Sequence, residues 1–270
     1  MSFSFLSLFE QTLCEAWQLL YRNTTIISIA RMLHNLVRIL PIALLPNLCC
    51  GLSSLIDIAN MALKNSPSAN RFITNKMCPF AQKVYCALEA SGTPYQMEEI
   101  SLYGKNGKPD WFLKLNPRGT VPVLVVGGGA AVFPDSDEVL DQFENGRLDG
   151  NVPLYPPPDR SDVREAIKDW RSRINAMLPD GKSSVLSSGK MTKNLHKHLK
   201  GMNDAVVSPY LASQRLTTAD CHAFPFLWRL AQEYPNEFTS DFPALSTWLE
   251  LCQAQPSFSR TIQSSWWWWW

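Results

Sequence analysis

The chain has 270 residues, of which 46% are hydrophobic and 18% charged, a composition that excludes wholesale disorder and collagen-like or low-complexity architectures. Lys and Arg number 25 against 24 Asp and Glu, so the net charge of +1 offers no excess of positive field for a phosphate backbone and argues against nucleic acid as a partner. The seven cysteines lack the spacing of a disulfide scaffold and the four histidines lack zinc-site spacing, so we expect reduced thiols and no metal.

Residues 1–68 differ in composition from the rest and are predicted to form an apolar, helical N-terminal extension. The uncharged run 39–56 reaches the lower length limit for spanning a bilayer, but Pro41, Pro46 and Gly51 interrupt it, so a clean transmembrane helix is not favoured. The Arg spacing and Ser content suit a plastid or mitochondrial targeting segment or a membrane-surface helix, and an extension with neither role is about as well supported. The protein is therefore placed either in the cytoplasm or in an organelle.

Residues 69–146 alternate between strand and helix patterns and are predicted to form one α/β domain. A strand, a helix and a second strand come first, followed by a short helix, a hairpin with a triple-glycine turn, and a capped helix. Pro79 suits the first position of the first long helix. In order, the predicted elements span 71–74, 80–90, 95–100, 111–117, 120–126, a return strand ending at 133, and 136–143.

Residues 147–158 are rich in Pro, Gly and Asn and are predicted to be a linker to an all-helical domain at 159–265, with a five-tryptophan tail at 266–270. Thr217 and Asp220 fit a capping box, in which each side chain bonds the other residue's backbone amide. The Ser- and Lys-rich stretch 180–192 is expected to interrupt the helical pattern. The predicted helices span 160–178, 190–212, 217–233 and 243–254.

Cys78 is the strongest candidate for chemistry because it lies where a strand meets a helix N-terminus. Unpaired backbone amides and the positive end of the helix dipole favour the thiolate at such a position. Cys86 lies eight residues along the helix, about 12 Å away, whereas a disulfide needs Cα atoms within about 7 Å. Cys86, Cys221 and Cys252 fit apolar helical patterns and are predicted to be small buried hydrophobes. A lone reactive thiol must exchange with a small thiol from solution, for which glutathione is the abundant candidate.

Several segments, in this order, resemble the cysteine-type glutathione transferases, closest to the omega class. The resemblance covers roughly residues 70–262 and implies a thioredoxin-like α/β domain followed by an all-α domain. The segments that carry it are Met77-Cys78-Pro79-Phe80-Ala81-Gln82-Lys83-Val84, Gly107-Lys108-Pro109-Asp110-Trp111-Phe112, Asn116-Pro117-Arg118-Gly119-Thr120-Val121-Pro122-Val123-Leu124, Asp135-Ser136, Leu216-Thr217-Thr218-Ala219-Asp220 and Phe242-Pro243-Ala244-Leu245.

The resemblance implies that Cys78 forms a mixed disulfide with glutathione, the co-substrate. It implies that Lys108 pairs with the glycyl carboxylate and that Val121, preceding a cis Pro122, bonds the cysteinyl backbone of glutathione as an added strand. The alternative for Pro122 is a trans proline at a strand edge. The sequence also departs from the family in its triple-glycine turn and its long N-terminal extension.

Three further residues complete the glutathione site that the resemblance implies. Asp135 and Ser136 would hold the γ-glutamyl end, Ser136 through its backbone amide at a helix start, and Phe80 would also contact glutathione. Omega enzymes usually carry Glu where this chain has Asp135, so the contact with the ammonium group is expected to be rearranged. An N-cap role alone is the alternative for Asp135.

The function implied is that of a glutathione-dependent thiol transferase or reductase acting on a small oxidised or electrophilic substrate, including dehydroascorbate reduction and deglutathionylation. The resemblance also implies a homodimer. The alternative is a membrane-associated protein like the chloride intracellular channels, or a non-catalytic partner-binding protein of the same fold. The tryptophan tail would suit a membrane interface, a partner groove or docking on its own domain.

Overall fold

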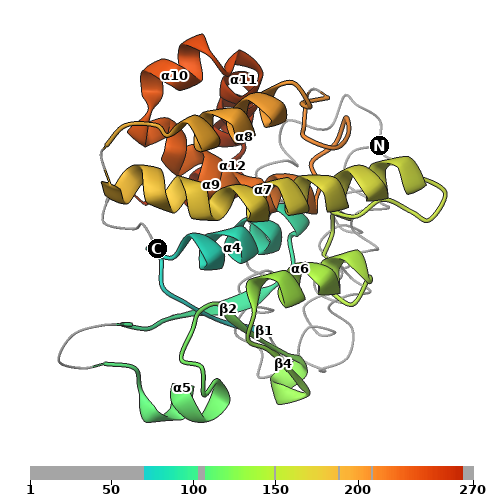
Figure 1. Ribbon diagram of the computed structural model, residues 1–270. Helices are drawn as coiled ribbons and strands as arrows, with labels where there is room; N and C mark the ends of the chain where they lie inside the picture. The colour runs from blue at the N-terminus through green and yellow to red at the C-terminus, as the bar shows by residue number, and fades with distance from the viewer. Residues whose placement is uncertain (1–69, 103–106, 149, 188, 208, 264–270) are drawn as a thin grey trace, which may run out of the picture. The chain divides into compact units, whose positions relative to one another are not determined.

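A computed structural model describes residues 70–102, 107–148, 150–187, 189–207 and 209–263 (Figure 1). The chain divides into two units, Met1–Ser66 and Pro67–Trp270, and all described residues belong to the second. The predictions for residues 1–68 and for the tail at 266–270 therefore lie outside the described residues. Within the described part of the chain, no helix has both the length and the apolar character needed to cross a membrane.

A four-stranded mixed sheet of order β2-β1-β3-β4 forms the base of the first domain. β1 runs parallel to β2 and antiparallel to β3, and β3 runs antiparallel to β4. The parallel pair with its crossover helix and the following hairpin give a thioredoxin-like arrangement, as expected. The strands are β1 (Asn70–Thr74), β2 (Tyr95–Glu99), β3 (Val123–Val126) and β4 (Ala131–Phe133).

The first domain contains helices α4 (Pro79–Ser91), α5 (Asp110–Leu115) and α6 (Ser136–Glu144). α4 begins with a proline at its first position, as predicted, and ends at Gly92, whose left-handed φ of 69° is readily adopted by glycine. The linker passes close to this end of α4, because a Cβ atom on Gly150 would lie 2.1 Å from the backbone oxygen of Ser91. Gly150 therefore cannot be replaced without moving the linker away from α4.

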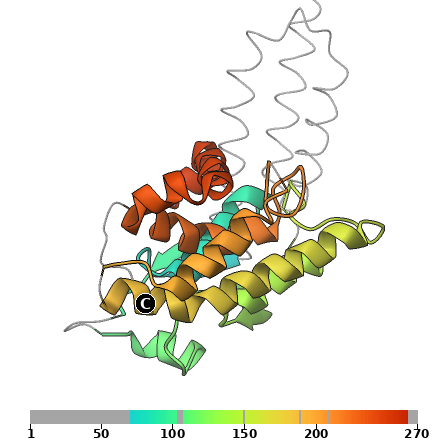
Figure 2. The same cartoon turned by 45° about the horizontal axis from the view of Figure 1, so that its top comes forward.

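The described residues of the second domain form helices and connecting loops, with no strand among them. α7 is the longest of these helices and packs against α8 and α9 (Figure 2). α9 is the central helix, and every residue from Thr218 to Leu230 is buried. The helices are α7 (Ser161–Ser187), α8 (Lys193–Asn203), α9 (Thr218–Glu233), α10 (Pro235–Ser240), α11 (Pro243–Ala254) and α12 (Pro256–Ser259).

Two predicted helix boundaries are wrong. α7 does not stop before the Ser-rich stretch but runs to Ser187 with Pro179 inside it, because Met177 and Ser184, seven residues apart on one helix face, are both buried. α8 ends at Asn203, well short of residue 212, because the Asn203 side chain accepts hydrogen bonds from the first amides of α11, including that of Ala244 at 2.9 Å. Tertiary contacts thus override the local pattern in both places.

The capping box that begins α9 is confirmed. Asp220 Oδ2 accepts hydrogen bonds from the Thr217 backbone amide at 2.8 Å and from the Thr217 hydroxyl at 3.1 Å. Its Oδ1 accepts from Leu211 N at 3.0 Å and from Trp248 Nε1 at 2.9 Å. The same buried carboxyl group therefore starts α9 and ties it to α11.

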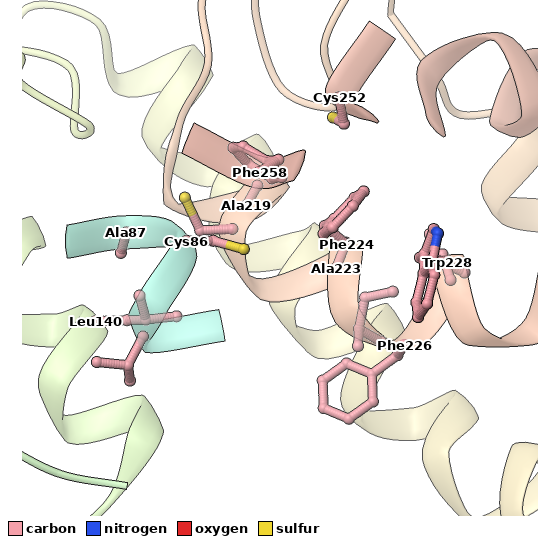
Figure 3. Close-up of a cluster of buried hydrophobic side chains, with 14 of the residues drawn as sticks. Cys86, Ala87, Leu140, Ala219, Ala223, Phe224, Phe226, Trp228, Cys252 and Phe258 are labelled. Carbon is pink, nitrogen blue, oxygen red and sulfur yellow. The ribbon is translucent and has the colours of Figure 1, made fainter. Parts of the chain in front are cut away.

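α4 lies between the sheet and α9, so the two domains meet along this helix (Figure 1). The core continues from α9 to α12, where the Phe224 and Phe258 rings pack edge to face with their centroids 4.8 Å apart (Figure 3). Cys86, Cys221 and Cys252 are each 0% exposed in this core, which confirms them as buried hydrophobes. Side chains on α9 therefore pack directly against α4, the helix that begins after Cys78.

Candidate active site

Cys78 is the N-cap residue of α4 and is held by bonds to both sides of the turn. Its backbone amide donates to Asn75 O at 3.0 Å, and its carbonyl oxygen accepts from Gln82 N at 2.9 Å, the first hydrogen bond of the helix. The Asn75 side chain accepts from Met77 N and donates to Ile100 O, both at 3.0 Å. Asn75 thus anchors the turn to the end of β2, a role that its sequence position did not reveal.

The Cys78 thiol faces the Val121–Pro122 peptide. Its Sγ donates to Val121 O at 3.7 Å, and the Val121–Pro122 bond is cis, as predicted. The loop that presents this peptide is held by buried Asn116, whose Nδ2 donates to Thr120 O at 2.8 Å. The structure therefore brings together Cys78 and the strand start that was expected to bind the glutathione backbone.

Lys108 lies over the turn that precedes Val121. A Cβ atom on Gly119 would come within 2.9 Å of Lys108 Nζ, and Gly119 has a left-handed φ of 64°. The left-handed backbone favours glycine at this position, and a side chain there would also displace the end of Lys108. The ammonium group of Lys108 lies beside the loop of the proposed glutathione site.

Asp135 and Ser136 begin α6, and Asp135 is its N-cap, which confirms the capping role considered as the alternative. Asp135 Oδ1 accepts from Asp137 N at 2.7 Å and from Glu138 N at 3.3 Å. Both capping bonds fall on the same oxygen of the Asp135 carboxyl group. Ser136 is buried at the first helical position.

An ion cluster with a half-exposed aspartate and buried partners joins the starts of α4 and α6. Asp137 Oδ1 lies 2.8 Å from Lys83 Nζ, 3.1 Å from an Arg171 nitrogen and 3.3 Å from His222 Nδ1. Lys83 and His222 are both 0% exposed. Burial raises the pKa of Asp137, but the close approach of His222 and the Lys83 charge outweigh it and hold that pKa far below its ordinary value. This cluster links the Cys78 helix to the Asp135–Ser136 helix start.

Opposing effects act on the Cys78 thiol. Burial raises its pKa, while the amides of Ala81 and Phe80 and the charges of Arg229 and Lys83 lower it, and burial prevails. The direction of this shift is opposite to the expectation that the helix N-terminus favours the thiolate at Cys78. Burial, which the local sequence pattern does not reveal, is the largest effect on this pKa.

Phe80 contributes to the site with its backbone and to the domain interface with its ring. Its amide is one of the groups that lower the pKa of Cys78. Its ring meets that of Phe226 on α9 edge to face, with the centroids 5.2 Å apart. Phe226 of α9 therefore packs against the second residue after Cys78.

Buried His222 makes the stability of the fold depend on pH. Its pKa is lowered from 6.5 to about 4, chiefly by burial. Between these values the unfolded chain binds more protons, so stability falls as the pH falls, by up to about 1.4 kcal/mol per pH unit. Asp137 adds a loss only below about pH 4, because its unfolded pKa is about 3.9.

We expect His222→Gln to flatten this slope in urea unfolding measured between pH 4 and 7. His196→Gln, which removes a histidine whose side chain is 45% exposed, is the control and should keep the wild-type slope. Equal slopes for His222→Gln and the wild type would contradict the assignment.

Comparisons with known proteins agree with this arrangement. Family models described as the glutathione S-transferase N-terminal and C-terminal domains match residues 77–145 and 189–256. A probable cytosolic glutathione S-transferase DHAR1 from Oryza sativa subsp. japonica is 32% identical over 57% of this chain and 67% of the relative. Glutathione S-transferase omega-1 from Sus scrofa is 24% identical over 70% of this chain and 78% of the relative.

The fold is also found among solved structures. Glutathione transferase Omega 3C from Trametes versicolor superposes with a TM-score of 0.61 at 22% identity and covers 77% of this chain and 95% of that one. At this identity the likeness establishes the fold alone.

Among the described residues, no group of three or more His, Cys, Asp or Glu side chains is arranged to hold a metal ion.

Proposed function

The chain belongs to the glutathione S-transferase family, and from that premise we propose that it is a glutathione-dependent thiol transferase that works through a mixed disulfide on Cys78. The observation that carries the proposal is the Cys78 thiol at the start of α4, 3.7 Å from the carbonyl oxygen that precedes cis Pro122. No second thiol lies close enough along α4 to resolve an oxidised Cys78, because Cys86 is buried eight residues away. The proposed resolving thiol is therefore that of a glutathione molecule from solution.

The reaction balances with glutathione as the reductant. The Cys78 thiolate attacks the glutathione sulfur of a mixed disulfide, the substrate thiolate leaves and takes up a proton, and Cys78 becomes S-glutathionylated. A second glutathione thiolate then attacks that disulfide, which releases oxidised glutathione and the Cys78 thiol. With dehydroascorbate as substrate, two glutathione thiols are oxidised to one disulfide and the substrate accepts two electrons and two protons.

The residues around Cys78 fit a bound glutathione. The proposed roles are an ion pair from Lys108 to the glycyl carboxylate, a backbone pairing at Val121, and contacts from Asp135 and Ser136 to the γ-glutamyl end. Because both capping bonds of Asp135 use Oδ1, its Oδ2 is suited to accept from the ligand ammonium group. The Ser136 amide, at the positive end of α6, favours the carboxylate beside it.

The names of the relatives support redox chemistry with small molecules, because they include both omega-1 and DHAR proteins. Dehydroascorbate and low-molecular-weight mixed disulfides are therefore the proposed substrates. The membrane-associated alternative rests on residues 1–68 and 266–270, which the structure does not describe.

The direct test is the mass of the intact protein after incubation with oxidised glutathione. We expect one glutathione adduct that maps to the peptide containing Cys78 and is removed by reduced glutathione. The variant Cys252→Ala, which removes a buried cysteine of α11, should form the same adduct. An adduct mapped only to other cysteines, or none while iodoacetamide still labels Cys78, would contradict the proposal.

A further inference from the structure

A buried polar cluster lies on the side of α4 that faces the second domain. Gln82 is 3% exposed and its Nε2 donates to the Thr261 hydroxyl at 3.1 Å. Its Oε1 accepts a short hydrogen bond from the Arg229 guanidinium, and Arg229, on α9, is 2% exposed. Gln82 is thus held between two elements of the helical domain.

The C-terminal segment holds α4 at more than one point on this face. Thr261 Oγ1 lies 3.4 Å from Cys86 Sγ, one turn after Gln82. Arg260 donates to Glu89 Oε2 at 2.7 Å, about one further turn along the helix. Residues 82, 86 and 89 of α4 share one face, so consecutive residues after α12 fix the direction of α4.

Arg229 itself is fixed by a second bond. The same guanidinium nitrogen that bonds Gln82 donates to Pro225 O at 2.8 Å, one turn earlier in α9. Its carbon atom Cζ lies 5.7 Å from the centre of the Trp228 ring. The cation is therefore held in one place at the domain interface and cannot swing out to solvent.

The contact between Arg229 and Gln82 leads directly to the thiol. The backbone amide of Gln82 makes the first hydrogen bond of α4, to Cys78 O at 2.9 Å. That bond closes the turn whose Phe80 and Ala81 amides face the Cys78 sulfur. Holding the Gln82 side chain therefore holds the donors that stabilise a thiolate at Cys78.

We infer that Arg229 is a positioning residue for the Cys78 thiol, acting through Gln82 from the opposite domain. Its fixed charge also favours the thiolate directly and lowers the pKa of Cys78 against the effect of burial. Burial lowers the pKa of Arg229 to about 10, so it remains a cation at neutral pH. The inference takes from the proposed function only that Cys78 is the reacting group.

The test measures the alkylation rate of Cys78 by iodoacetamide between pH 6 and 10, with the label quantified on the Cys78 peptide. Arg229→Met should slow the reaction about tenfold at pH 7 and displace the rising part of its pH profile upward by about one unit, since each unit changes the thiolate fraction tenfold. Arg229→Lys keeps the charge and should recover part of the rate. These variants leave unchanged the other charged or titratable groups on α4 and on the elements packed against it, which are Lys83, Glu89, Asp137, His222 and Arg260.

Two further variants make the result decisive. Gln82→Met keeps the volume of the side chain and leaves Arg229 in place, but it removes the hydrogen bond between them. This variant should also slow alkylation of Cys78. It therefore tests the inference even if Arg229→Met does not fold. Arg164→Met removes an arginine that bonds Pro156 O in the linker, and it should leave the profile unchanged. The inference is overturned if a folded Arg229→Met or Gln82→Met variant alkylates Cys78 with the wild-type rate and pH profile. Because alkylation needs no glutathione, a failure of the proposed function would appear separately, as loss of the glutathione adduct.

Discussion

Replacing Cys78 by serine is expected to lower glutathione-dependent reduction of hydroxyethyl disulfide by at least about 1000-fold, as for the loss of a covalent nucleophile in other enzymes. Serine keeps the size of the side chain and the N-cap position at the start of α4. A hydroxyl group cannot form the mixed disulfide on which the cycle depends, and it does not ionise near neutral pH. The loss should therefore appear in turnover while the fold is retained.

The measurement is the steady-state rate at saturating glutathione, with thermal unfolding as the check on folding. Cys252→Ser is the matched control, because it makes the same chemical change at a buried cysteine of α11. The control should retain at least half of the wild-type activity per folded molecule. Turnover by Cys78→Ser above one tenth of the wild-type rate would mean that another group performs the reaction.

The same serine variant reports on the type of reaction. A serine or tyrosine at this position would favour conjugation of glutathione to an electrophile over disulfide exchange. We therefore expect any conjugating activity toward 1-chloro-2,4-dinitrobenzene to survive in Cys78→Ser when disulfide reduction is lost. Loss of both activities in a folded variant would point instead to failure of glutathione binding.

The parts of the site that follow from local chemistry could be predicted from the sequence. The start of α4 at Pro79, the cap at Asp135 and the capping box at Thr217 each depend on residues within one turn of the chain. The cis bond before Pro122 came from the resemblance, and the structure agrees. These features fix where the helices that carry the site begin.

The parts that depend on the second domain could not be predicted. Lys83 follows Phe80 by three residues, and nothing in the local sequence distinguishes it from an exposed lysine on a helix. It is nevertheless 0% exposed, with Asp137 of α6 as its ion-pair partner. Arg229 is separated from Gln82 by 147 residues. Burial is the largest effect on the pKa of Cys78, so the sequence predicts Cys78 as the reacting residue but not the balance of effects on its pKa.

Among the polar contacts between the helices of the site, we expect the ion cluster around Asp137 to show the largest loss of stability on substitution. In Asp137→Asn the side chain keeps its shape but loses its charge, which leaves the Lys83 ammonium without its partner at 2.8 Å. Removing one partner of a buried pair typically costs 3–5 kcal/mol. Because the Asp137 side chain is 40% exposed and water can reach it, we expect a smaller loss of about 2–3 kcal/mol in the free energy of unfolding.

A double-mutant cycle separates the pair from the rest of the cluster. Lys83→Met replaces the buried ammonium with an apolar chain of similar length, so its stability should stay within about 1 kcal/mol of the wild type. With no buried ammonium left to compensate, Asp137→Asn should cost less in the Lys83→Met background, and the coupling should exceed about 1 kcal/mol in urea unfolding at pH 7. Arg171 and His222 would still contact position 137, so part of the cost should persist. Additive effects of the two substitutions would show that Arg171 and His222, rather than Lys83, hold Asp137 at the start of α6.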